Sequence, residues 1–135
     1  MTLPDGLSAG ARATLRIIVT DADTAVAAGS GDVPVLATPR LLALAEAACV
    51  AAIAPRMTPE LTSVGTAVRL EHRQASPVGA EVDIEAELTE INGSRLVFMF
   101  IARPADDSDR VIGAGTLERV VVDRERFLIR SDSRG

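Results

Sequence analysis

The sequence predicts an α+β domain in which an antiparallel sheet wraps around one long buried helix. Three observations predict this class. An apolar run at 41–55 has helical start and stop signals at its two ends. Several later segments alternate apolar and charged residues with a period of two, as half-buried strands do. Turn signals such as Asn92-Gly93 join these segments by short connections, which favours antiparallel pairing.

Length and composition predict one cytoplasmic domain over residues 1–135, with 1–12 as a loose lead-in. Hydrophobic content is 47% and aromatic content 2%, so the core is expected to consist of Ala, Val, Leu and Ile. One cysteine and no basic, apolar leader favour a reducing compartment. The net charge of -5 argues against nucleic acid as a partner. The apolar run, interrupted by Glu46, is expected to be too short to span a membrane.

The helix is predicted to begin with Thr38 as its N-cap and Pro39 at its first position. Pro55 is expected to end it at Ala54. The apolar side chains of this segment point in different directions around the helix axis. The helix is therefore expected to be enclosed on all sides.

The predicted strands alternate in the direction of their side chains. Strand 64–72 is expected to place its even residues, ending with His72, against the helix. In strand 81–88 the even residues face inward and the acidic odd residues form a solvated face. Strand 95–102 is apolar on both faces, so it is central or meets another subunit. Strands are also expected at 13–20 and 110–122, and loops at 27–34, 76–79 and 104–109.

Glu46 interrupts the apolar helix. The commonest position of a helical glutamate is an exposed one. No other charged residue lies between Arg40 and Arg56, however, so this helix has no obvious polar face. An unpaired carboxylate in apolar surroundings costs on the order of several kcal/mol. We therefore interpret Glu46 as a candidate functional residue.

Two further side chains, those of His72 and Thr38, are candidate functional residues together with Glu46. His72 is the only histidine, and its parity places it on the inward face; taken alone, it is most simply a satisfied histidine at a strand end. Facing a carboxylate, it forms a possible acid–base pair. Thr38 serves as a helix cap, and its hydroxyl can also position water or a carbonyl group. Cys49 is interpreted as a buried structural thiol, and no metal site is expected from one cysteine and one histidine.

Over residues 36–127 the chain resembles the hotdog-fold thioesterases, specifically the fluoroacetyl-CoA thioesterase-like group. The resemblance is carried by ATPRLLALAEAAC, TSVGTAVRLEHRQASPVG, INGSRLVF and GAGTLERVVVDRERF. It implies a strongly bent sheet around the helix, a homodimer or a dimer of dimers, and acyl-CoA hydrolysis. It maps the family's catalytic threonine, glutamate and histidine onto Thr38, Glu46 and His72. Selectivity for fluoroacetyl is not implied, because the loop before Thr38 lacks the aromatic residues of the fluoroacetyl-specific member.

The expected function is hydrolysis of a small or medium acyl-CoA thioester, with no cofactor beyond the coenzyme A of the substrate. Glu46 would act as general base or nucleophile, His72 would stabilise it and carry a proton, and Thr38 would hold the substrate oxygen. Further substrate-binding residues are expected to be Leu36, Gly65, Arg69 and Arg73, with Arg124 and Arg126 as further candidates for the phosphates.

Two alternatives keep the same fold. The first is a non-catalytic protein that binds acyl-CoA or another small ligand, which would bind without releasing thiol. The second is an enoyl-CoA hydratase, which would need an Asp–His pair that the sequence does not offer.

Overall fold

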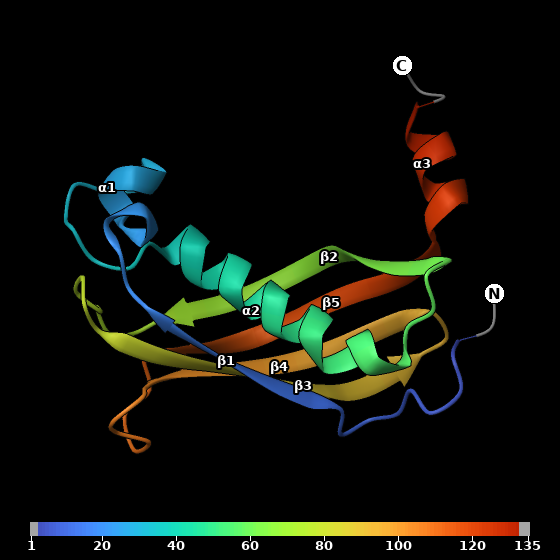
Figure 1. Ribbon diagram of the computed structural model, residues 1–135, viewed down its shortest axis with the longest axis horizontal. Coiled ribbons are helices and arrows are strands. Elements are labelled where there is room, and N and C mark those ends of the chain that lie inside the picture. Colours follow the sequence, from blue (N-terminus) through green and yellow to red (C-terminus); the bar gives the residue numbers. More distant parts are fainter. Residues whose placement is uncertain (1–2, 133–135) are drawn as a thin grey trace.

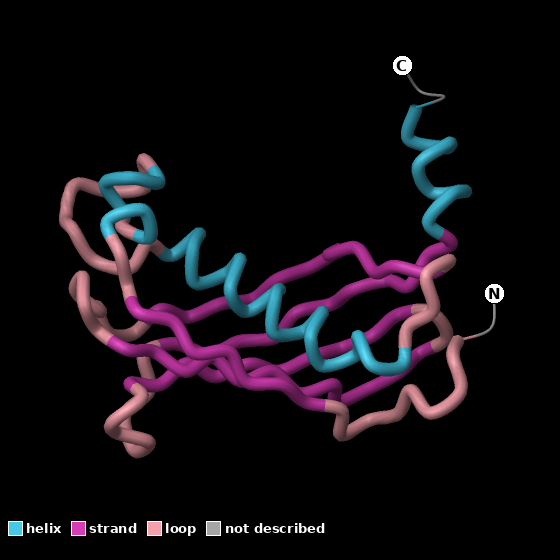
Figure 2. The backbone as a smooth tube through the Cα atoms, in the orientation of Figure 1, coloured by secondary structure: helices cyan, strands magenta, loops and turns pink. Residues whose placement is uncertain are grey.

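The computed structural model describes residues 3–132 and contains a five-stranded antiparallel sheet that curves around helix α2 (Figures 1 and 2). The sheet order is β1-β3-β4-β5-β2. The strands are β1 (Arg12–Ile18), β2 (Leu61–His72), β3 (Glu81–Asn92), β4 (Arg95–Pro104) and β5 (Gly113–Asp123). The helices are α1 (Ala25–Ala28), α2 (Thr38–Ile53) and α3 (Arg124–Asp132), with 3-10 turns at Asp21–Asp23 and Ala54–Arg56. The predicted α+β class is confirmed.

The core lies between the concave face of the sheet and α2. Alternation in β3 is confirmed, because its inward residues are fully buried and its acidic residues are not. Strand β4 lies between β3 and β5, so its predicted central position is confirmed. Its inward side chains, Leu96, Phe98, Phe100 and Ala102, belong to the core, whereas Met99 on the other face is 55% exposed.

Helix α2 begins one residue earlier than the predicted Thr38 cap would place it. Ala37 is the N-cap, with extended backbone, and Thr38 is the first helical residue. The α-helix ends at Ile53, and the chain continues through a 3-10 turn that contains Pro55. Because the hydroxyl of Thr38 does not cap the helix, it is available for another partner.

The expectation that α2 is enclosed on all sides is wrong for the single chain. The sheet covers one side, formed by Leu41, Leu44, Ala45, Ala48, Cys49, Ala52 and Ile53. On the other side Ala43, Ala47 and Val50 are exposed. Small alanines make both sides apolar in sequence, so the pattern does not reveal which side the sheet covers.

The expectation that this segment is too short to cross a membrane is also wrong by length and hydropathy alone. The helical stretch Thr38–Arg56 has 19 residues and a mean hydropathy of 1.3, which is enough for a membrane span. The core helix of a soluble protein meets the same criteria, and here the segment packs on the sheet. The sequence property therefore does not distinguish the two.

Strand β2 contains an irregularity that changes which residues face α2. Gly65 pairs with Arg119 and Ala67 pairs with Glu118, so Thr66 is an extra residue, a β-bulge. Before the bulge the odd residues face α2, and after it the even ones do. The predicted inward position is therefore confirmed for His72 and wrong for Val64, and Gly65 faces α2 rather than the outside.

The described part of the lead-in, residues 3–11, is not loose. Gly10 donates to the carbonyl oxygen of Leu88 at 2.8 Å, and Leu88 donates to Ala11 at 2.8 Å. Leu3 and Leu7 pack against the core. These contacts hold the segment beside β3.

Candidate functional site

Thr38 and His72, which are 34 residues apart, meet at one end of α2. Thr38 is the first residue of the helix and His72 the last of β2. Thr38 Oγ1 and His72 Nδ1 are 2.8 Å apart, a hydrogen bond. The pair lines an open pocket of about 310 Å³ together with Leu36, Arg73 and the loop at 30–35. The structure thus brings together four of the residues that the sequence singled out.

A buried carboxylate fixes the start of the helix. Asp23 accepts hydrogen bonds from the amide and hydroxyl of Thr20 at 2.8 and 3.0 Å, and from Arg40 Nε at 2.8 Å. Its own carbonyl accepts from the amide of Ala37 at 2.9 Å, directly before Thr38. Burial would raise the pKa of Asp23, but the bonds from Thr20 and Arg40 outweigh it and lower the pKa. This network fixes the position of the Thr38 backbone.

Of the two ring nitrogens of His72, only one has a hydrogen-bond partner at the pocket. Nδ1 contacts Thr38, whereas Nε2 is buried and has no hydrogen-bond partner among residues 3–132. Burial lowers the pKa of His72, opposed by a smaller effect of the Gln74 backbone. The imidazole is therefore mainly neutral at pH 7, and the neutral ring has one acceptor nitrogen. With Nδ1 as that acceptor, the Thr38 hydroxyl donates to it, as in a hydroxyl group poised to lose its proton.

We expect the imidazole of His72 to titrate below pH 6.5, because burial disfavours its charged form. The unfolded chain binds this proton more readily, so the free energy of unfolding falls as the pH drops through 6.5 and below. Since the chain has one histidine, its Cε1–Hε1 NMR signal is unambiguous. The urea-unfolded protein serves as the reference, and a folded-state midpoint at or above 6.5 would contradict the expectation.

Glu46 lies in a second centre, in the middle of α2. Its Oε2 is 3.2 Å from Nη1 of Arg119. Arg119 also donates to the hydroxyl and the carbonyl of Ser63, at 2.9 Å each. The Arg119 side chain is 9% exposed and that of Glu46 35%, so a buried cation meets a carboxylate that still reaches solvent. The pair explains how a lone carboxylate is tolerated in this helix.

Gly65 leaves the space that this carboxylate occupies. A Cβ atom at Gly65 would lie 2.7 Å from Glu46 Oε2, so any side chain there would displace the carboxylate from this position. Gly65, predicted as a substrate-binding residue, is thus placed beside Glu46.

Within one chain the two centres do not merge. Thr38 and Glu46 are eight residues apart on α2, about 12 Å along the helix axis. The predicted convergence of Glu46 and His72 on one cavity is therefore wrong for the single chain. Sequence reasoning also missed Arg119, although it shares its parity with the buried Leu117 and Val121, an unusual place for a charge.

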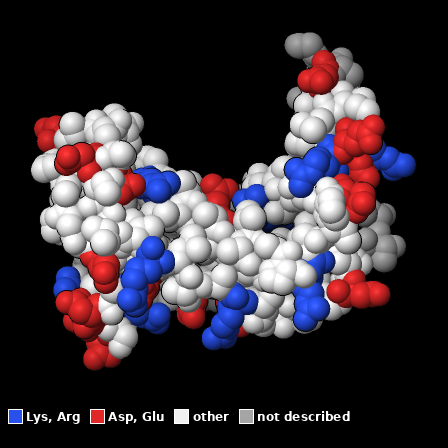
Figure 3. Space-filling model, viewed as in Figure 1, with Lys and Arg blue, Asp and Glu red and all other residues white. Residues whose placement is uncertain are grey.

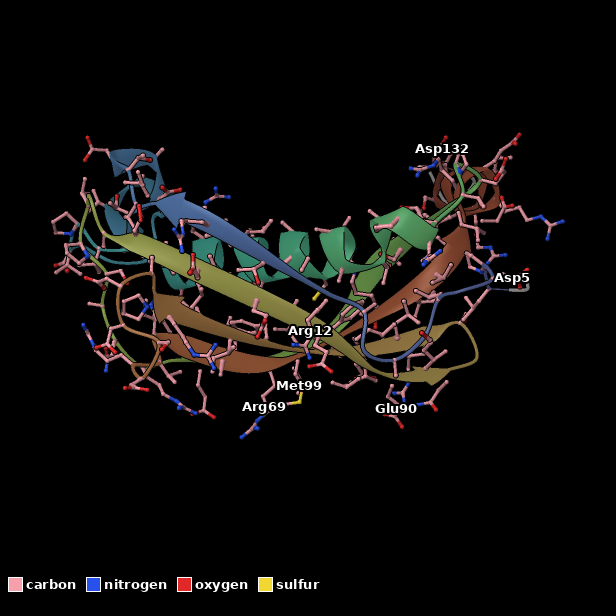
Figure 4. The ribbon with its side chains drawn as sticks, turned by 60° about the horizontal axis from the view of Figure 1, so that its bottom comes forward. Asp5, Arg12, Arg69, Glu90, Met99 and Asp132 are labelled. Atoms are coloured by element: carbon pink, nitrogen blue, oxygen red, sulfur yellow. The ribbon has the colours of Figure 1, made fainter. Side chains whose placement is uncertain are left out.

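Of the four arginines suggested for phosphate binding, only Arg73 lines the Thr38–His72 pocket. Arg69 points away from α2, beside Met99 on the outer face of the sheet, and its side chain is 80% exposed (Figure 4). Arg124 donates to the carbonyl oxygens of Pro59 and Leu61. Arg126 lies on the exposed helix α3.

Cys49 is fully buried in the core. Burial raises the pKa of its thiol to about 12. A thiol that stays protonated is a poor nucleophile, which agrees with a structural interpretation.

The chain matches known proteins along most of its length. The family model of the fluoroacetyl-CoA-specific thioesterases matches residues 19–125. A fluoroacetyl-CoA thioesterase from Streptantibioticus cattleyicolor is 41% identical over 93 residues, which cover 69% of this chain and 65% of the relative, just under two thirds of its length.

Solved structures agree with the sequence matches. A fluoroacetyl-CoA thioesterase superposes with a TM-score of 0.87 and 34% identity, covering 97% of this chain and 99% of the other. A threonine-to-serine mutant of a fluoroacetyl-CoA thioesterase, in complex with acetyl-CoA, superposes with a TM-score of 0.86 and 31% identity. The match covers 95% of this chain and 98% of the other. The predicted hotdog fold is thereby confirmed, and the chain belongs to the fluoroacetyl-CoA-specific thioesterase family.

Proposed function

We propose that the protein hydrolyses acyl-CoA thioesters at the pocket lined by Thr38 and His72. The 2.8 Å hydrogen bond between this hydroxyl and the only imidazole carries the proposal. Such a pair moves protons, and the first turn of α2, which has no side-chain cap, offers N–H donors to a carbonyl oxygen. The activity named for the relatives, and the acetyl-CoA complex of one of them, support this substrate class.

The reaction uses water and the side chains of the protein, without a cofactor. Glu46 takes a proton from water, whose oxygen attacks the thioester carbonyl carbon. The N–H groups at the start of α2 stabilise the resulting oxyanion. The C–S bond then breaks, giving a carboxylic acid and a thiolate. The proton that Glu46 took from water passes to the thiolate by way of the Thr38–His72 pair, so all three side chains return to their starting protonation states.

Glu46 reaches the pair when two copies assemble as a homodimer. Strand β2 is an edge of the sheet, and the exposed side of α2 lies in a hollow with few charges (Figure 3). If two β2 edges pair antiparallel about a two-fold axis between Val68 and Arg69, Gly65 of one copy faces His72 of the other. Glu46, which lies against Gly65, then approaches the second copy's Thr38 and His72. This arrangement joins the two centres without moving either.

Thiol release from a panel of acyl-CoAs tests the function. We expect turnover by the wild type, and a fall in kcat/KM of about a hundredfold or more in Thr38→Val and His72→Gln, as for loss of acid–base groups. Thr14→Val, on an exposed position of β1, is the matched control. Saturable binding of acyl-CoA without thiol release would establish the non-catalytic alternative. Full activity in both site variants would refute the site.

A further inference from the structure

The pocket beside Thr38 and His72 is large for a two-carbon acyl group. Its volume is about 310 Å³. At about 30 Å³ for a water-sized group, it holds about ten such groups. An acetyl or fluoroacetyl group extends only one carbon beyond the carbonyl, so it would leave most of the pocket filled with water.

The wall of the pocket that is contributed by α1 and the following loop is mainly aliphatic. Its aliphatic side chains are those of Ala25, Val33, Val35 and Leu36, and Ser30, Gly31 and Asp32 complete this wall. Polar side chains, Arg73 and Gln74 among them, come from the segment after β2. Each methylene of a ligand that leaves water for an aliphatic wall makes binding tighter. The pocket is therefore suited to an aliphatic chain whose carbonyl end lies at Thr38.

Backbone hydrogen bonds hold the wall in place. The amide of Ala25 donates to Val35 at 2.8 Å, and that of Ser30 donates to Ala25 at 3.0 Å. The amide of Leu36 donates to Ser76 at 2.8 Å. These bonds fix the loop at both ends, so the space is preformed.

From this geometry, and resting on the proposed function, we infer that the preferred substrates are thioesters of medium-length aliphatic acids, of roughly four to eight carbons. The fluoroacetyl and acetyl thioesters are poorer substrates, because they contact little of the aliphatic wall. The aliphatic side chains of the wall set this preference.

Gly31 is the position at which the preference can be changed. A Cβ atom there would lie 3.4 Å from Cβ of Ala25, and both residues line the pocket. Its backbone is not in the left-handed region, so a larger side chain is compatible with it. Gly31→Leu fills part of the pocket, and Ala28→Leu adds similar bulk on the exposed side of α1, outside the lining.

The test compares kcat/KM for acetyl-, fluoroacetyl-, butyryl-, hexanoyl- and octanoyl-CoA. We expect hexanoyl-CoA to exceed acetyl- and fluoroacetyl-CoA by about tenfold or more in the wild type and in Ala28→Leu. In Gly31→Leu the value for hexanoyl-CoA falls about tenfold or more, and that for acetyl-CoA stays within about threefold. Val33→Phe, with Val26→Phe as its control, repeats the comparison should Gly31→Leu not fold.

Three outcomes overturn the inference. In the first, the wild type hydrolyses acetyl- or fluoroacetyl-CoA as well as hexanoyl-CoA. In the second, the pocket-filling variants lower kcat/KM equally for all five substrates. In the third, no thiol is released from any of the five, which refutes the proposed function as well and so is distinguishable from the first two.

Discussion

Replacing Glu46 by glutamine is expected to lower kcat/KM by about a hundredfold or more while the protein stays folded. The amide oxygen of glutamine can still accept the hydrogen bond from Arg119, so the packing of α2 on the sheet is retained. An amide cannot take a proton from water, so the proposed base is lost. The measurements are thiol release and thermal unfolding.

Glu118→Gln is the matched control. Glu118 is also a carboxylate paired with an arginine, Arg95, but it lies on β5 away from Glu46. It is expected to keep the wild-type rate. If Glu46→Gln retained more than about a tenth of the activity, Glu46 would be only the counterion of the buried Arg119, and the proposed mechanism would be wrong.

Mixing two inactive variants is expected to restore activity. In the proposed dimer, each site takes Thr38 and His72 from one copy and Glu46 from the other. A heterodimer of His72→Gln and Glu46→Gln then contains one site with all three residues intact. Random pairing gives half heterodimers with one working site out of two, so about a quarter of wild-type activity returns.

The result can be interpreted only if the two variants have exchanged subunits and formed heterodimers. Two affinity tags, purified in sequence, isolate the heterodimer, whose activity is expected to reach about half that of the wild type. A mixture of His72→Gln with Thr38→Val is the negative control, because both lesions affect the same half of the site. A purified heterodimer without activity would show that Glu46 does not act across the interface.

Much of the fold follows from local patterns. The alternation of Val82, Ile84 and their neighbours predicts β3 and its buried face, and Asn92-Gly93 predicts the hairpin to β4, because both signals are local. The ends of α2 are predicted to within one residue by Pro39 and Pro55. The inward position of His72 is also predicted correctly, by parity alone.

The remaining features depend on contacts between distant segments. The bulge at Thr66 arises in the pairing of β2 with β5, and the sequence of β2 alone does not predict it. The partner of Glu46 is Arg119, 73 residues away, which becomes visible only once β5 lies beside β2. Helix α3 has charged and apolar residues without a clear buried face, so its sequence does not predict a helix.

The extra residue at Thr66 has a consequence for how this chain can vary in length. It shifts the phase of β2 once, so that Gly65 and His72 both point toward α2 although their numbers differ in parity. Losing or gaining a single residue between them would turn the imidazole to the convex side. Only steps of two, about 6.6 Å each, would preserve the direction of both side chains. The spacing of the two centres along β2 can therefore change only by an even number of residues.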